Sequence, residues 1–158
     1  MTTVFDAVRS SPLARELTPS EIDVLAGMVT LRDLKDGEVL LPAGSCDGHL
    51  HVVAAGRIEV VHAAEHGPTV LARLGPGDLV GELSFMDDEP RYAALVASGP
   101  TKVLVLERSD FETLVESSPR LVYKVMRAIM RVSHAVQRRL SLELRDMENY
   151  IYRTGAKA

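Results

Sequence analysis

The chain has 158 residues, a formal net charge of −4 and an apolar content of 46%, values typical of one globular domain with its own core. The acidic balance argues against general nucleic-acid binding, because neutralising phosphates requires a basic surface. No apolar run approaches the roughly 18 residues that cross a bilayer, and the first residues lack the pattern of a signal peptide. The single cysteine, Cys46, cannot form an internal disulfide, so we expect a cytoplasmic protein that does not enter the membrane.

Residues 1–28 are predicted to form the N-terminal helices of a single domain spanning residues 1–158. Thr18-Pro19-Ser20-Glu21 has the spacing of a capping box, with proline at the first helical position. Ile22 and Leu25 follow at helical spacing, and Gly27 marks the predicted end of this helix.

Residues 29–107 have the alternating apolar pattern and frequent turn residues of short β-strands. The predicted strands are 29–34, 38–41, 49–55, 57–62, 69–74, 78–80, 92–97 and 101–106. Eight short strands without long helices between them favour an antiparallel sheet over a parallel one. We therefore predict an α+β fold in which an eight-stranded antiparallel β jelly-roll barrel is flanked by N-terminal helices and a long C-terminal helix.

Residues 109–152 are predicted to be helical again. The segment 109–112 has the spacing of a second capping box, and Ser118-Pro119 begins a longer helix of roughly 50 Å. Apolar residues recur along that helix at every third or fourth position: Leu121, Val125, Ile129, Val132, Val136, Leu140, Leu144, Met147 and Ile151. One barrel cannot cover so long a stripe, so we expect a homodimer formed by two copies of this helix.

The segment GELSFMDDEPRYAALV, residues 81–96, combines a glycine and an acid with an arginine that enters an apolar strand. A guanidinium can donate two parallel hydrogen bonds to a phosphate, and free amides at the start of a helical turn favour the same anion. Glu82 can accept a hydrogen bond from a ribose hydroxyl, and Gly81 permits close approach of the backbone. The pattern therefore predicts a site for a small anionic sugar between Gly81 and Arg91.

This segment resembles the phosphate-binding cassette of cyclic nucleotide-binding domains, a family that includes catabolite-activator-type regulators and the regulatory subunit of cAMP-dependent protein kinase. Segments 34–44, 49–61, 71–82 and 103–119 are also similar to the matching parts of such domains. The resemblance implies that Glu82 binds the ribose 2′-hydroxyl and Arg91 the phosphate. It further implies phosphate contacts from the backbone amides around Gly81, Leu83 and Ser84 and from that of Tyr92, and a contact to the base from Gln137 on the C-terminal helix.

The function that the resemblance implies is a non-catalytic regulatory module without a cofactor. It would bind cAMP or cGMP and signal through its C-terminal helix to an effector protein that the sequence does not identify. Too few residues follow the long helix for a helix-turn-helix, so DNA binding of the catabolite-activator type is not expected. Tyr92 departs from the family, in which a small residue usually stands at this position.

Two alternatives stay open at the level of sequence. Glu82 and Arg91 can instead form a buried ion pair that braces a turn, which would make the protein a dimeric scaffold with a degenerate pocket. His49 and His51 lie on one face of a predicted strand, a spacing that can hold a metal and that resembles a cupin-like metal enzyme. Glu59 is too distant from the two histidines to complete the cupin motif, so half-exposed strand histidines are the favoured interpretation.

Overall fold

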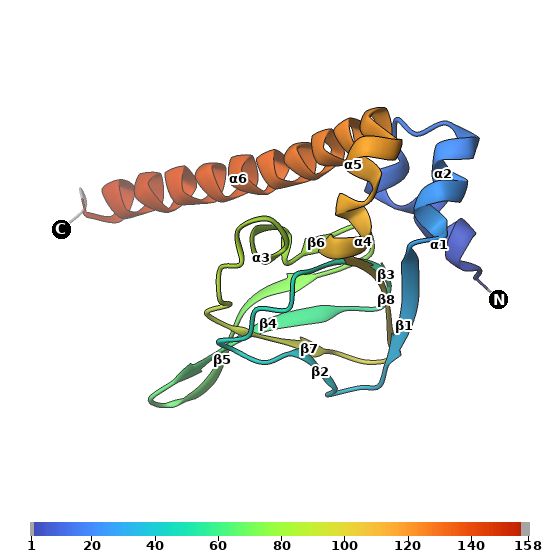
Figure 1. Ribbon diagram of the computed structural model, residues 1–158. Coiled ribbons are helices and arrows are strands. Elements are labelled where there is room, and N and C mark those ends of the chain that lie inside the picture. The colour runs from blue at the N-terminus through green and yellow to red at the C-terminus, as the bar shows by residue number, and fades with distance from the viewer. Residues whose placement is uncertain (1, 156–158) are drawn as a thin grey trace.

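The computed structural model describes residues 2–155, with the side chains of these residues other than Leu83 (Figure 1). The chain begins with α1 (Val4–Ser10), the 3-10 helix η1 (Pro12–Ala14) and α2 (Pro19–Ala26). Strands then follow, interrupted by one short helix: β1 (Val29–Leu34), β2 (Val39–Leu41), β3 (His49–Ala55), β4 (Ile58–Ala64), β5 (Gly67–Leu74), β6 (Leu79–Val80), α3 (Glu82–Asp87), β7 (Ala94–Ala97) and β8 (Thr101–Glu107). The chain continues through α4 (Arg108–Glu112), α5 (Leu114–Ser117) and α6 (Pro119–Gly155).

The eight strands form two four-stranded sheets with the orders β1-β8-β3-β6 and β2-β7-β4-β5. All described pairs are antiparallel, so the α+β class and the antiparallel strands are confirmed. No pairing joins a strand of one sheet to a strand of the other within residues 2–155, so the predicted closed jelly-roll barrel is not confirmed. The strands β2 and β6, each at the edge of its sheet, have only three and two residues.

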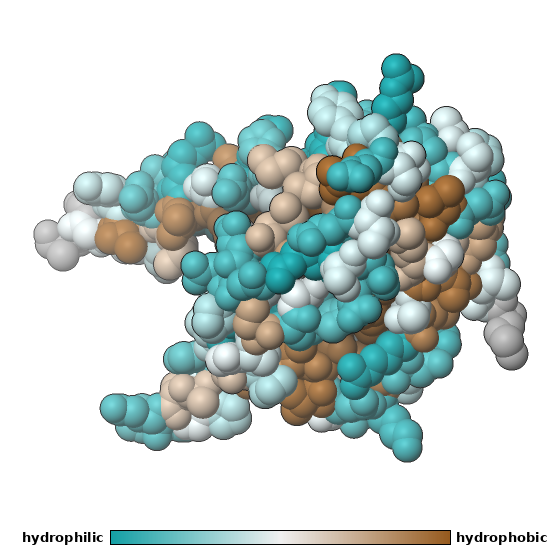
Figure 2. Space-filling view, viewed as in Figure 1, coloured by the Kyte–Doolittle hydropathy of each residue, from teal (hydrophilic) through white to brown (hydrophobic). Residues whose placement is uncertain are grey.

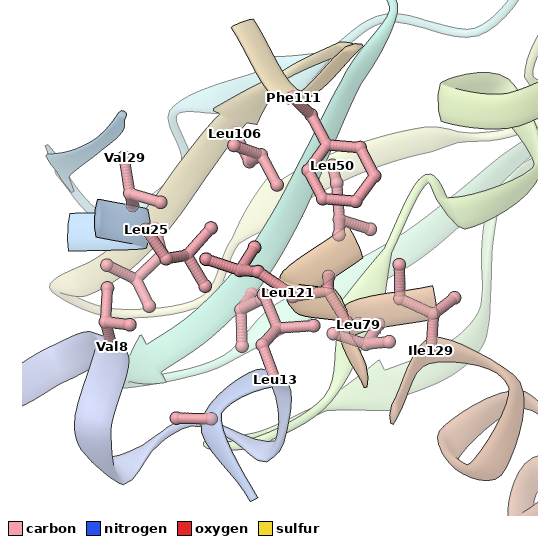
Figure 3. Close-up of a cluster of buried hydrophobic side chains, with 14 of the residues drawn as sticks. Val8, Leu13, Leu25, Val29, Leu50, Leu79, Leu106, Phe111, Leu121 and Ile129 are labelled. Carbon is pink, nitrogen blue, oxygen red and sulfur yellow. The ribbon is translucent and has the colours of Figure 1, made fainter. Parts of the chain in front are cut away.

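Two apolar clusters hold these layers together. One lies between the two sheets and includes Val53, Ile58 and Val103, none of them more than 1% exposed. The other lies between the helices and the sheet that contains β3 and β8, and it is drawn in Figure 3. Leu121 and Val125 of α6 belong to this second cluster, so burial of their side chains fixes the start of α6 against the rest of the fold.

Capping boxes define the start of two helices, α1 and α2, but not that of α4. The predicted box at Thr18 and Glu21 caps α2, and a box that the sequence analysis missed caps α1 through Thr3 and Asp6. The predicted box at 109–112 is wrong, because α4 already begins at Arg108, directly after β8. Ser109 therefore lies inside the helix and cannot cap it.

Helix α6 is 37 residues long, but only its first part packs against the fold. Its buried residues end at Ile129, and Figure 1 shows the helix passing above α3 and projecting beyond the sheets. Apolar side chains continue along the part after Ile129, as Figure 2 shows, and Leu140, Leu144, Met147 and Ile151 are each more than half exposed. Within residues 2–155, no helix has the length and apolarity that crossing a bilayer would require.

Candidate functional site

Gly81 and α3 form one wall of the candidate site. Gly81 adopts a left-handed conformation with φ of 84°, and its carbonyl accepts a hydrogen bond from the Phe85 N–H at 2.8 Å, which closes the first turn of α3. Phe85 is completely buried, with its ring centroid 5.6 Å from that of Phe111, so the core anchors the turn. The first amides of a helix have no partner within it, so those of Glu82, Leu83 and Ser84 have no acceptor inside α3.

Arg91 packs directly against this turn. Its side chain is 10% exposed, and its Nε and Nη2 atoms are buried with no hydrogen-bond partner among the residues that the structure describes. A Cβ placed on Gly81 would lie 2.9 Å from the Arg91 Cζ, so the guanidinium occupies space that only glycine leaves open. A buried cation with unused donors beside free amides forms a site suited to an anion.

Arg91 was predicted to open a strand, and this prediction is wrong, because β7 begins only at Ala94. The backbone of Arg91 pairs instead with the loop before β3. Its N–H donates to the Ser45 carbonyl at 3.0 Å, and its carbonyl accepts from the Gly44 N–H at 2.6 Å. These two bonds hold the arginine in place without a regular strand.

Asp47, on the same loop, is the counter-ion of Arg91. The Asp47 Oδ1 lies 3.6 Å from the Arg91 Nη2, which is within ion-pair range but beyond a hydrogen bond. Its other oxygen, Oδ2, lies 3.1 Å from the His49 Nδ1 and 3.9 Å from the His51 Nε2. The sequence analysis did not identify Asp47. Its position in a glycine-rich turn before β3 was the available signal, but its partner lies far along the chain.

Glu82 is half-buried at the first position of α3. No ion pair within 4.0 Å joins Glu82 to Arg91 in the part of the chain that the structure describes. The arginine faces Asp47 instead, so the bracing pair considered from the sequence is formed with a different acid. The Glu82 carboxylate is thereby available as an acceptor.

The side chain of Ser84 is engaged within the protein. Its buried hydroxyl donates to the Glu89 carbonyl at 2.6 Å and lies 3.9 Å from the Cys46 sulfur, so it fastens the acidic loop that follows α3. Leu83 lies in the first turn of α3, and its side chain is outside the described set.

Tyr92 and Gln137 are both exposed. Tyr92 is 75% exposed, so its ring is not part of the core. Its carbonyl lies 3.4 Å from the His62 Nδ1. Gln137 is exposed on the part of α6 that extends beyond the packed residues. A contact between Gln137 and a ligand would therefore require α6 to approach the site.

The histidine pair differs from the half-exposed pair that the sequence analysis favoured. His51 is 2% exposed, whereas His49 is partly exposed and also lies 3.4 Å from a carboxylate oxygen of Glu107. Burial lowers the pKa of His51 to about 4, the nearby Asp47 carboxylate opposing this shift. Among residues 2–155, no three histidine, cysteine or acidic side chains are grouped so that they could hold a metal ion.

Comparison with known proteins identifies the family to which these features belong. Residues 31–118 match the family described as "Cyclic nucleotide-binding domain". The structure of a cyclic nucleotide-binding domain from Methylobacillus flagellatus superimposes with a TM-score of 0.76 at 26% identity, covering 87% of this chain and 78% of that one. The resemblance inferred from the cassette is therefore confirmed.

Two of the similar proteins are longer than the part that matches this chain. The Cyclic AMP receptor protein of Thermus thermophilus is 30% identical over 78% of this chain and 58% of its own length. Acetyltransferase Pat of Mycolicibacterium smegmatis is 31% identical over 61% of this chain and 29% of its own length. The chain thus spans little more than half of the first relative and less than a third of the second.

Proposed function

We propose that this chain, which belongs to the cyclic nucleotide-binding domain family, is a non-catalytic regulatory module that binds one cyclic mononucleotide, cAMP or cGMP. The name of the Thermus thermophilus relative, a cyclic AMP receptor, supports cAMP as the first ligand to test. The proposal requires no cofactor besides this ligand. The cytoplasmic location expected from the single cysteine stays a prediction.

The observation that carries the proposal is the buried guanidinium of Arg91, two of whose nitrogens have no hydrogen-bond partner among the described residues. Burying its Nε and Nη2 atoms without a hydrogen-bond partner costs free energy, unless a ligand supplies acceptors. Two oxygens of a cyclic phosphodiester can accept parallel hydrogen bonds from these atoms. The free amides at the start of α3 lie beside the guanidinium, because Gly81 contacts it, and they would bind the same phosphate.

The remaining contacts follow from the same arrangement. Glu82 begins α3, and its carboxylate would accept a hydrogen bond from the ribose 2′-hydroxyl. The amide of Tyr92 would donate to the phosphate while its exposed ring stays in solvent. Gln137 would contact the base only after α6 closes over the site.

We further propose that α6 carries the signal and forms a homodimer. Its first part is tied to the N-terminal segment by Lys124, which donates to Glu21 at 2.6 Å, and by Arg131, which pairs with Glu16 at 2.9 Å. Its second part exposes an apolar stripe that a second copy of the same helix would cover. The domain can bind its ligand more tightly when α6 is in one position than when it is in another. Ligand binding would then shift the helix, and the shift would be transmitted to an effector protein.

The scaffold alternative predicts that the pocket binds nothing. The exposed stripe of α6 is compatible with that alternative, but the unpaired donors of Arg91 favour a ligand. The metal-enzyme alternative has no support from the histidine pair, because His49 and His51 share their carboxylate neighbour Asp47 without assembling a ligand set in residues 2–155.

Calorimetric titration with cAMP, cGMP and linear 5′-AMP tests the proposal. We expect saturable binding of at least one cyclic nucleotide, and much weaker binding of 5′-AMP, because the cassette suits a phosphate that is tied back to its ribose. Absence of binding heat and of a thermal shift at millimolar cyclic nucleotide would support the scaffold alternative instead.

A further inference from the structure

The buried side of the candidate site contains an acid and a base that the proposed function does not use. Asp47 places one carboxylate oxygen 3.6 Å from the Arg91 Nη2 and the other 3.9 Å from the His51 Nε2. His51 lies on β3 between two valine partners, Val80 on β6 and Val105 on β8. Its Nδ1 is buried and has no hydrogen-bond partner. One carboxylate therefore stands between the phosphate-binding cation and a buried imidazole.

The charges that act most strongly on His51 belong to four side chains. Asp47 favours the protonated ring, whereas Arg91, His49 and Arg32 on β1 disfavour it. The residues paired with His51 on β6 and β8 are both valines, Val80 and Val105, so neither of these two partners places a charge beside the ring. Without a ligand, the charges of Arg91 and Asp47 cancel, and burial keeps His51 neutral by lowering its pKa to about 4.

We propose that Asp47 and His51 form a proton-linked counter-ion for Arg91, so that binding of the anionic ligand is coupled to uptake of one proton by His51. This inference rests on the proposed function, because it requires an anion at Arg91. Among the described residues, Asp47 is the ion-pair partner of Arg91, and the ligand phosphate would take over this role. His51 is a positioning residue that acts through Asp47 and does not need to touch the ligand.

The coupling follows from charge balance in a buried site. When a phosphodiester with one negative charge binds Arg91, the group of Arg91, Asp47 and the ligand carries one excess negative charge. A proton on His51 restores neutrality, and the charged imidazole can donate from Nε2 to the Asp47 carboxylate that Arg91 has released. The ring nitrogen Nδ1, which has no partner in this structure, is the second position where the proton can reside.

The direction of the pH dependence follows from these pKa changes. In the free protein the pKa of His51 is about 4, so the ring is neutral well above that pH. In the complex the added negative charge should raise this pKa. Affinity should then increase as pH falls through the pKa of the complex, by at most about tenfold per pH unit. At a pH above both pKa values the affinity should be constant.

Calorimetric titration of the full chain with cAMP and cGMP, between pH 5.5 and 7.5, tests the coupling. Each titration is repeated in two buffers that differ in ionisation enthalpy, because the difference in heat counts the protons taken up. We expect tighter binding at pH 5.5 and uptake of up to one proton. In His51→Phe, which keeps a buried ring, binding should persist while the uptake and the pH dependence disappear.

His49→Gln is the matched control, since His49 lies on the same strand and is closer to Asp47 than His51 is. This variant should retain the proton uptake. Binding of the wild-type protein without proton uptake, uptake that persists in His51→Phe, or uptake lost in His49→Gln alone would each overturn the inference and leave the proposed function intact. No binding at either pH would overturn the proposed function, and the inference with it.

Discussion

The guanidinium of Arg91 rests on the bare Cα of Gly81, in the space that a side chain at residue 81 would fill. A Cβ there would come within 2.9 Å of the Arg91 Cζ, and Gly81 also holds a φ of 84° that L-residues rarely adopt. The positive φ of residue 81 and its contact with the Arg91 guanidinium are therefore two independent reasons for a glycine at this position. The contact joins the turn that supplies free amides to the side chain that supplies the cation.

Gly81→Ala should weaken cyclic-nucleotide binding by displacing Arg91, and it should also lower stability by roughly 1–2 kcal/mol through the left-handed backbone. Gly77→Ala separates the two effects, because Gly77 has a φ of 90° with nothing within 4 Å of a Cβ. Urea unfolding should give a similar stability loss for both variants, while titration should give an affinity loss for Gly81→Ala alone. Equal affinities would mean that Arg91 does not need its present position.

Glu82→Gln should weaken binding roughly ten- to a hundredfold, because a hydrogen bond to a charged acceptor is worth about 1.5–3 kcal/mol. The same change should reduce discrimination against the 2′-deoxy nucleotide, which lacks the donor. Glu89→Gln is the control, since its side chain is exposed in the following loop. Unchanged discrimination in Glu82→Gln would assign Glu82 a structural role.

Tyr92→Ser should have little effect on stability, because a ring that is 75% exposed contributes little to the core. We expect a change in the free energy of unfolding within about 0.5 kcal/mol. Affinity should stay within roughly threefold of the wild-type value, because the backbone amide remains. Parallel melting and titration measure both quantities, and a gain in affinity would show that the ring narrows the site when the ligand binds.

Replacing Val136 and Leu140 with glutamate should convert a dimer into monomers, because both lie on the apolar stripe of α6 beyond the packed residues. Light scattering at tens of micromolar measures the mass. Arg138→Glu adds a negative charge on the same turn without removing an apolar side chain, and it should remain dimeric. A monomeric wild-type protein at this concentration would contradict the proposed dimer.

Local patterns predicted most of the fold from the sequence. The runs 29–34 and 49–55 match β1 and β3, and Pro119 begins α6 as its position after Ser118 predicts. These features depend on alternation and capping, which are encoded by neighbouring residues. The failed box at 109–112 is also informative, because β8 continues directly into α4 and leaves no capping residue before Ser109.

The candidate site was only partly predictable, for a physical reason. The cassette residues from Gly81 to Arg91 are close in sequence, so their spacing was recognisable. Asp47 and His51 reach Arg91 through tertiary contacts that no local pattern encodes. The closure of the barrel and the burial of His51 likewise depend on how the two sheets pack, and both differed from expectation.

The most direct test of the central claim is the effect of Arg91→Met on both stability and affinity. Arg91 is buried with two unpaired nitrogens, and its counter-ion Asp47 keeps a second partner in His49. Because Asp47 is partly exposed and keeps this second partner, replacing Arg91 should change the melting temperature of the free protein little. The same change should reduce affinity for the cyclic nucleotide by at least roughly ten- to a hundredfold. A lowered melting temperature with unchanged affinity would contradict this account and make Arg91 a structural brace.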